Sequence, residues 1–203
     1  MTVTRLSRRA FVAGAPLALA ACGAEEIWAP DSLMQERRYV HGGQPSLTLY
    51  TVRNVGSDNG AHSGLLVNAS QRVMFDPAGT FKHPKIPERN DVLFGMSPRA
   101  LEVYINYHTR VTYYTNAQTV AVSAGVAERV LQDVTSYGAV PKSMCTRSIS
   151  TILGRTPGFE SIRTVWFPDK LEESFAKIPG VKMERYVDDD SDNNAIVLQS
   201  EIA

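Results

Sequence analysis

The chain has 203 residues, of which 43% are hydrophobic and 21% charged, and its formal net charge is zero. This length and composition are typical of one globular domain of moderate size, and they exclude a fibrous or largely disordered protein. The sequence has no basic stripe, which excludes the electrostatic type of nucleic-acid-binding protein.

Residues 1–21 differ in character from the rest of the chain. Basic residues precede an apolar run over residues 10–21, which is the pattern of an export signal and is too short to span a bilayer as a permanent helix. The paired Arg8 and Arg9 resemble a twin-arginine signal. The sequence Leu-Ala-Ala-Cys that ends at Cys22 resembles the lipobox of bacterial lipoproteins.

The lipobox resemblance implies that Cys22 becomes the first residue of the mature chain and carries acyl chains, so the protein is anchored to a membrane without spanning it. Gly23 stands where an aspartate would retain a lipoprotein at the inner membrane. We therefore expect the outer membrane, with the protein facing the periplasm. Removing residues 1–21 lowers the net charge from 0 to about −3. An ordinary signal peptide followed by a chance cysteine is the alternative.

Three segments follow the signal. Residues 22–45 contain a Gly-Gly pair, two prolines and mixed charge, so we expect a membrane tether. Residues 46–187 are expected to form the folded domain. Residues 188–203 begin with a run of aspartates that lacks the glycine turn of a calcium loop, so an acidic, solvated tail is expected in preference to a cation site.

Within the domain, the sequence alternates strand, loop and helix signals. Strands are expected at 46–52, 65–67, 73–75, 92–94 and 110–122, the last as one strand or a bent pair. Helices are expected from Ser97 to His108, from Ser123 to Gly138, and over 146–153, because each begins beside a capping or polar residue or stops at a glycine. The stretch 78–97 is predicted to be a long loop beside a binding groove.

The strands at 65–67 and 73–75 form a predicted hairpin whose register decides whether His62 and Asp76 meet. If Val67 pairs with Gln71, directly opposed residues have numbers that sum to 138, and His62 faces Asp76 on one side of the sheet. A slip of one residue would place the two side chains on opposite faces. Taken alone, the hairpin is more typical of an exposed histidine at its mouth and an aspartate in a turn.

Cys145 is the second residue of chemical interest. With Cys22 lipidated, it is the only remaining thiol in an oxidising compartment, so it is either inert and buried or retained because it reacts. It lies at the start of the helix predicted over 146–153, where backbone N–H groups and the helix dipole favour the thiolate and can hold an oxyanion. Lys142 and Arg147 add positive charge nearby.

The order of these residues, with His62 on the first hairpin strand, Asp76 after the second, and Cys145 at a helix N-terminus, resembles one enzyme family. It is similar to the circularly permuted branch of the NlpC-type papain-like cysteine hydrolases, a branch that resembles the lecithin:retinol acyltransferase group, in which His precedes Cys along the chain. The resemblance covers residues 46–153. It implies an α+β, papain-like fold with a central antiparallel sheet and a cysteine-bearing helix packed on it. Met144 stands where many permuted members have Asn.

The resemblance implies a catalytic set of Cys145 as nucleophile, His62 as base and Asp76 as the third, orienting member, a position more often filled by His, Asn or Gln. Gly64 is expected to leave room for the helix that carries Cys145. The protein would then be a lipid-anchored thiol hydrolase acting on an amide bond, with peptidoglycan peptides as the favoured substrate and acyl lipids second.

Other functions remain open at this point. The chain could be a non-catalytic envelope-binding or structural lipoprotein of the same fold, or an acyltransferase or lipid hydrolase. A redox partner is disfavoured because no C-x-x-C unit is present. No cofactor and no metal are expected, because His41, His83 and His108 show no ligand spacing and are predicted to lie on the surface or in loops.

Overall fold

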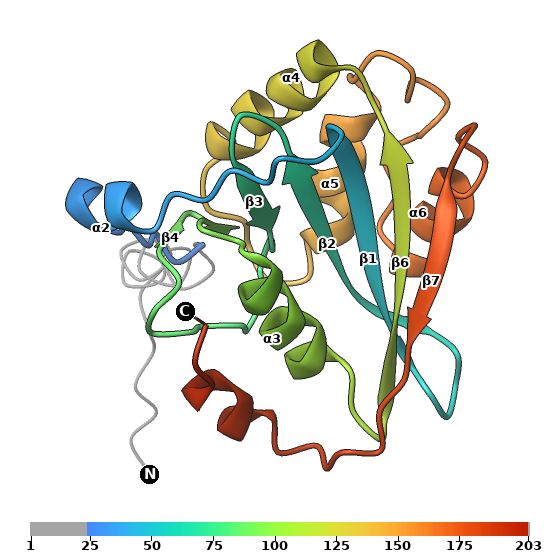
Figure 1. The fold of residues 1–203 in the computed structure, drawn as a ribbon. Helices are drawn as coiled ribbons and strands as arrows, with labels where there is room; N and C mark the ends of the chain where they lie inside the picture. The colour runs from blue at the N-terminus through green and yellow to red at the C-terminus, as the bar shows by residue number, and fades with distance from the viewer. Residues whose placement is uncertain (1–23, 203) are drawn as a thin grey trace, which may run out of the picture.

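The computed structural model describes residues 24–202, so the predicted export signal and the predicted lipidation site at Cys22 lie outside the described residues. The described chain forms an α+β fold around one seven-stranded sheet with the strand order β4-β5-β3-β2-β1-β6-β7 (Figure 1). Every neighbouring pair of strands is antiparallel. The expected α+β class and central antiparallel sheet are confirmed.

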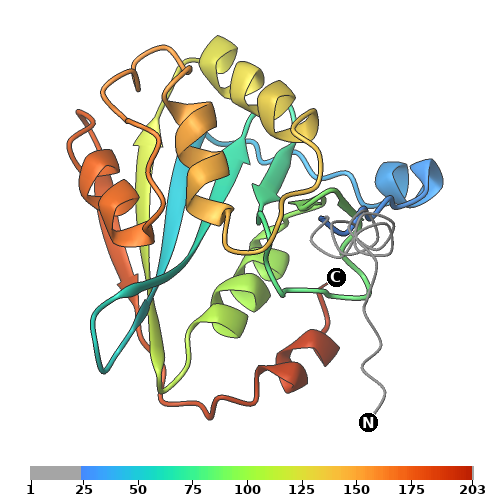
Figure 2. The same ribbon diagram turned by 180° about the vertical axis from the view of Figure 1, so that it is seen from behind.

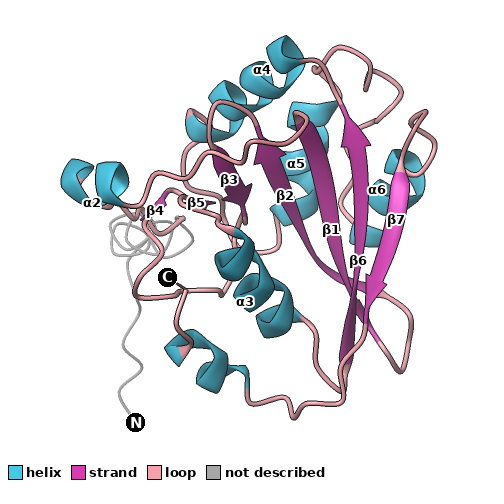
Figure 3. Ribbon diagram, viewed as in Figure 1, coloured by secondary structure: helices cyan, strands magenta, loops and turns pink. Residues whose placement is uncertain are grey.

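The strands are β1 (Ser46–Asn54), β2 (Gly60–Asn68), β3 (Arg72–Phe75), β4 (Glu88–Arg89), β5 (Val92–Leu93), β6 (Tyr113–Ala121) and β7 (Lys182–Tyr186). The helices are α2 (Asp31–Glu36), α3 (Pro98–His108), α4 (Ala124–Thr135), α5 (Cys145–Leu153), α6 (Pro168–Phe175) and the 3-10 helix η2 (Asn194–Gln199). Between β3 and α3 the chain is almost entirely loop, as expected for residues 78–97 (Figure 3). Within residues 24–202, no helix has both the length and the apolar character needed to cross a membrane.

Helices cover both faces of the sheet. α4, α5 and α6 lie on one face, which Figure 2 shows from behind, and α3 lies on the other. Side chains of the hairpin alternate between the two sides. Leu65, Val67, Val73 and Phe75 enter the core beneath α4, α5 and α6, whereas Leu66 and Met74 enter the core beneath α3. This alternation follows from the two-residue period of a strand and was predicted from the sequence.

Two of the predicted helix starts are confirmed in atomic detail. The hydroxyl of Ser97 accepts a hydrogen bond from the amide of Ala100 at 3.1 Å and caps α3. The hydroxyl of Ser123 does the same for Val126 at 3.3 Å and caps α4. Because these caps satisfy otherwise unpaired N–H groups, the start of each helix is encoded locally.

The segment predicted to be a tether, residues 22–45, instead packs against the domain in its described part. The amide of Asn90 donates to the carbonyl of Ile27 at 2.9 Å, and the amide of Ala29 donates to the carbonyl of Glu88 at 3.0 Å. The guanidinium of Arg89 lies 4.5 Å from the centre of the Trp28 ring. The segment covers the edge strand β4, whose backbone groups would otherwise lack partners.

The C-terminal segment is also not a solvated tail, as had been expected for residues 188–203. Val197 and Ile202 are buried in the core beneath α3. The carboxylate of Asp190 accepts from the guanidinium of Arg110 at 3.2 Å. The segment is held against the domain because an acid accepts a hydrogen bond from a residue that follows α3 and because the apolar residues after it are buried.

Candidate active site

The hairpin of β2 and β3 differs from its predicted register by two residues. Val67 pairs with Val73 and not with Gln71, so the numbers of opposed residues sum to 140 and not to 138. The change moves every partner by two residues, and a strand repeats its facing every two residues. The face assignment is therefore unaffected. His62 and Asp76 share one face, although they lie diagonally and not directly opposite.

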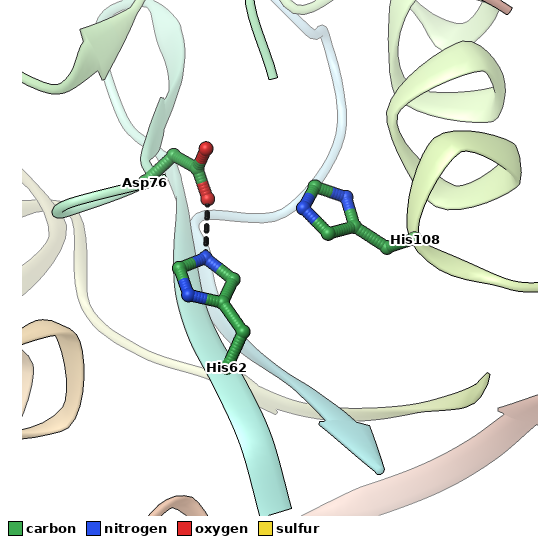
Figure 4. Close-up of side chains that lie close together, drawn as sticks. All are labelled: His62, Asp76 and His108. Carbon is green, nitrogen blue, oxygen red and sulfur yellow. Dashed lines mark hydrogen bonds and ion pairs between the residues drawn. The ribbon is translucent and has the colours of Figure 1, made fainter. Parts of the chain in front are cut away.

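The predicted meeting of His62 and Asp76 is confirmed. Nε2 of His62 donates to Oδ1 of Asp76 over 2.6 Å, as the dashed line in Figure 4 marks. Burial alone would lower the pKa of His62, but the charge and hydrogen bond of Asp76 outweigh it and raise the pKa to about 10. For Asp76, burial would raise the pKa, but the charge of His62 outweighs burial and lowers the pKa to about 2. The pair is therefore an imidazolium and a carboxylate at neutral pH.

Cys145 is the first residue of α5, and 9% of its surface is exposed. Burial raises the pKa of its thiol, but the hydrogen bond and charge of His62 lower that pKa to about 7, with help from the backbone N–H of Ser63 and the hydroxyl of Thr146. Asp76 occupies Nε2 of His62, so Nδ1 is the ring nitrogen that remains for another partner. The mutual pKa shifts couple the Cys145 thiol to the His62–Asp76 pair.

A hydrogen bond between β2 and α5 sets how closely the helix of Cys145 approaches the strand of His62. The hydroxyls of Ser63 on β2 and Thr146 on α5 lie 3.1 Å apart, and both residues are fully buried. Each is the chain neighbour of a site residue, His62 and Cys145 respectively. The sulfur of Cys145 lies 3.8 Å from the same threonine oxygen.

The start of α5 supplies donors for a negatively charged oxygen. Its N-cap residue, Met144, makes no side-chain hydrogen bond to the first turn, so no cap competes there for the N–H groups beside Cys145. Such groups carry the positive end of the helix dipole. They are suited to hold the oxyanion that forms when a thiolate attacks a carbonyl carbon.

Tyr104, on α3, belongs to the site but was not identified there from the sequence. Its hydroxyl donates to Oδ1 of Asp76 at 2.7 Å, the oxygen that also accepts from His62. Gly64 makes this possible, because a Cβ at that position would lie 2.5 Å from the tyrosine oxygen. The expectation that Gly64 makes room for the helix of Cys145 is wrong, since the space is taken by Tyr104.

His108 was expected on the surface or in a loop, and this prediction is wrong. It is the last residue of α3, and its ring lies parallel to that of His62, with centroids 5.5 Å apart and an angle of 9° between the planes (Figure 4). Nδ1 of His108 donates to the carbonyl of Tyr104 at 2.9 Å. Burial lowers the pKa of His108 to about 4 against the opposing charge of Asp76, so the ring is neutral beside a charged pair. The four-residue spacing of Tyr104 and His108 on a helix was the available signal.

The other two histidines lie in loops, as predicted, but His83 is buried. Its Nε2 donates to the carbonyl of Ser200 at 2.9 Å, which helps to hold the C-terminal segment. His41 is half-buried and lies 3.1 Å from the hydroxyl of Tyr39. Neither residue contacts the site.

The site contains one group of residues whose donor atoms lie close enough together to hold a metal ion. His62, Asp76 and His108 each offer one nitrogen or oxygen atom, and these atoms lie within 4.8 Å of one another. An ion there would compete with the proton that joins His62 to Asp76 and would draw the imidazole from Cys145.

The chain matches no family model, no curated protein and no solved structure. What the site can do follows from its geometry. A thiolate at a helix N-terminus, an imidazolium beside it and a carboxylate that orients the imidazolium form the arrangement required for nucleophilic attack on a carbonyl carbon.

Proposed function

We propose that the protein is a cysteine hydrolase or acyltransferase that acts on an amide or ester through Cys145. One observation carries this proposal: His62, which Asp76 holds at 2.6 Å through Nε2, lowers the pKa of the Cys145 thiol to about 7. A structural cysteine in an apolar core has a raised pKa and no such partner.

In the proposed reaction the Cys145 thiolate attacks the carbonyl carbon, and the N–H groups at the start of α5 hold the oxyanion. The bond to the leaving amine or alcohol then breaks, and the His62 imidazolium gives that group its proton, which leaves a thioester on Cys145. Water, or an alcohol or amine acceptor, attacks the thioester while His62 removes its proton. The new acid, ester or amide departs and the thiolate–imidazolium pair returns. Asp76 keeps the imidazole oriented through both halves.

The proposal extends to a papain-like fold of the circularly permuted NlpC type. It is supported by the chain order of His62 before Cys145, by the position of the thiol at a helix N-terminus, and by the packing of that helix on an antiparallel sheet. The substrate we propose is a component of the bacterial envelope, which the anchor proposed at Cys22 would bring within reach. Amides of peptidoglycan peptides come first and acyl lipids second.

A binding module without turnover is the second candidate, and the 9% exposure of Cys145 favours it. The two candidates differ in whether an acyl group ever becomes attached to the sulfur. Trypsin would cut after Lys142 and Arg147, so the thioester would appear on the short peptide 143–147.

The test is to incubate the purified chain with peptidoglycan fragments and with acyl esters, then measure product release and the mass of peptide 143–147. We expect products and an acylated peptide from the wild type, and neither from Cys145→Ala. His62→Ala should lower the rate by roughly 10²–10⁴-fold, whereas His41→Ala, outside the site, should not. Equal turnover by the wild type and Cys145→Ala would refute the proposal, and binding without acylation would favour the binding module.

A further inference from the structure

The cavity that contains Cys145 has a largely apolar wall. It measures about 590 Å³ and is lined by Ala61, Ser143, Trp166, Phe167 and Pro168. Trp166 is 54% exposed and Phe167 is 67% exposed, although both are among the most apolar side chains. Large apolar side chains left open beside a reactive group are typical of a binding surface, since they do not contribute to the protein core.

This wall is held in place by the elements that carry the site. α6 begins at Pro168 and packs so closely on β2 that a Cβ at Gly60 would lie 2.6 Å from the proline side chain. The guanidinium of Arg147, on α5, lies 5.3 Å from the centre of the Trp166 ring. The cavity is therefore built from contacts with the strand of His62 and the helix of Cys145.

A second, smaller cavity of about 200 Å³ lies on the histidine side of Ala61, which borders both cavities. Its lining is more polar and includes His62, His108, Arg110 and Asn194. Arg110 is 4% exposed, and its Nε has no hydrogen-bond partner within residues 24–202. The cation of Arg110 and the amide of Asn194 make this lining better suited to a polar group than to an apolar one.

The proposed reaction determines which half of a substrate each cavity would hold. The acyl group becomes attached to the sulfur of Cys145, whereas the leaving amine or alcohol must receive its proton from His62. The acyl half therefore extends into the apolar cavity that contains Cys145. The leaving group extends into the less apolar cavity, which contains His62.

We propose, on the basis of the proposed function, that the substrate joins a bulky apolar acyl group to a small polar amine or alcohol. Trp166 and Phe167 contact the acyl group, and Arg110 faces the polar leaving group. The apolar acyl group is either a fatty acyl chain or the residue of an apolar amino acid, because both present the same chemistry to the wall. Small or charged acyl groups leave this wall exposed to water, so of the two substrate classes proposed above, acyl lipids fit the wall better.

The first arm of the test does not require turnover. The purified full chain is treated with iodoacetamide, N-benzyl iodoacetamide or N-octyl iodoacetamide, and alkylation of peptide 143–147 is followed by mass spectrometry. We expect at least one apolar reagent to modify Cys145 about 10-fold faster than iodoacetamide. Phe167→Ala should remove this advantage without changing the rate with iodoacetamide itself, which shows that the thiol and the fold are intact. Val187→Ala, which changes a 74% exposed apolar residue elsewhere, should retain it.

The second arm measures turnover of N-lauroyl-serine, N-acetyl-phenylalanyl-serine and the reversed N-acetyl-seryl-phenylalanine. We expect Cys145-dependent cleavage of the first or the second, which identifies the acyl source, at least about 10-fold faster than cleavage of the reversed dipeptide.

The outcomes separate the two proposals. If the apolar reagents have no advantage over iodoacetamide, or if the reversed dipeptide is the better substrate, this inference is overturned while the hydrolase stands. If the apolar reagents are favoured but no substrate in either test acylates Cys145, the cavity is confirmed as an apolar site and the proposed function fails.

Discussion

Ser63 and Thr146 face each other across the contact between β2 and α5, with their hydroxyl oxygens 3.1 Å apart. They are 83 residues apart in the chain, and each directly follows a residue of the site, His62 or Cys145. Their hydrogen bond therefore fixes the height of the helix against the strand, and this height decides whether the thiol of Cys145 meets the imidazole of His62.

Thr146→Val is expected to loosen this contact while keeping the shape of the side chain. The buried hydroxyl of Ser63 would lose its partner, which costs about 1–3 kcal/mol of unfolding free energy. A small displacement of α5 should lower activity by roughly 10²-fold and slow the alkylation of Cys145. Thr48→Val is the matched control, because it removes a similar hydroxyl pair with Thr119, 2.9 Å apart, between β1 and β6. A variant Thr146→Val with unchanged thiol reactivity would show that the bond has no positioning role.

The reactivity of Cys145 should depend on pH in a defined way. Its pKa is lowered to about 7 and that of His62 is raised to about 10, so the thiolate–imidazolium pair exists between these two values. Alkylation should fall as the pH drops through about 7, because the thiolate becomes protonated. Activity should also fall as the pH rises through about 10, because His62 loses the proton that the leaving group needs.

His62→Ala tests the origin of the low thiol pKa. Without the imidazolium, burial raises the pKa of Cys145, so its titration should move from about 7 up to or beyond the ordinary value of 9.0. The measurement is the rate of iodoacetamide labelling of peptide 143–147 between pH 5 and 10. Slow labelling at every pH in both proteins would indicate an inert cysteine and would rule out the hydrolase.

Tyr104→Phe should weaken the site through Asp76. The hydroxyl donates to the buried carboxylate at 2.7 Å, and a hydrogen bond to a charged group contributes about 1.5–3 kcal/mol. Losing this donor raises the pKa of Asp76 and weakens its hold on His62, so the alkaline limit of activity should move to lower pH. Tyr107→Phe is the control. It removes another hydroxyl of the same helix, one that donates to the carbonyl of Thr80, and it should leave the pH profile unchanged. Identical profiles for the two variants would exclude a positioning role for Tyr104.

Gly79→Ala should displace the carboxylate of Asp76. A Cβ at position 79 would lie 1.9 Å from Oδ2 of Asp76, a distance that no relaxed structure tolerates. Activity should therefore fall by roughly 10²-fold, and the pKa of His62 should fall because its partner moves away. Gly125→Ala is the control, since a Cβ there meets nothing within 4 Å. On α4 it should be neutral or stabilise the fold by about 0.5–1 kcal/mol.

Cys22→Ala tests the proposed membrane anchor. If the chain is a lipoprotein, the variant should remain unprocessed or be released from the membrane fraction, and it should carry no acyl label. Fractionation of cells grown with a labelled fatty acid measures both properties. Unchanged membrane association together with an undiminished label would exclude lipidation at this residue.

The sequence alone determined the features that depend on neighbouring residues in the chain. Ser97 and Ser123 cap helices wherever the fold places them, because the orphan N–H groups are three residues away. The facing of the hairpin was predicted correctly even though its register was not, because a shift of two leaves the side-chain period intact. His62 and Asp76 could therefore be paired, and Cys145 could be placed at a helix start.

Only the tertiary structure decided which side chains from distant elements approach these residues. The four-residue spacing of Tyr104 and His108 places them on one face of α3, but which part of the sheet that face meets depends on how the whole helix packs. The aromatic wall at Trp166 and Phe167 depends on the close approach of α6 to Gly60. Such approaches are set by the shape of the whole core, in which each contact depends on many others, so local periodicity carries no record of them.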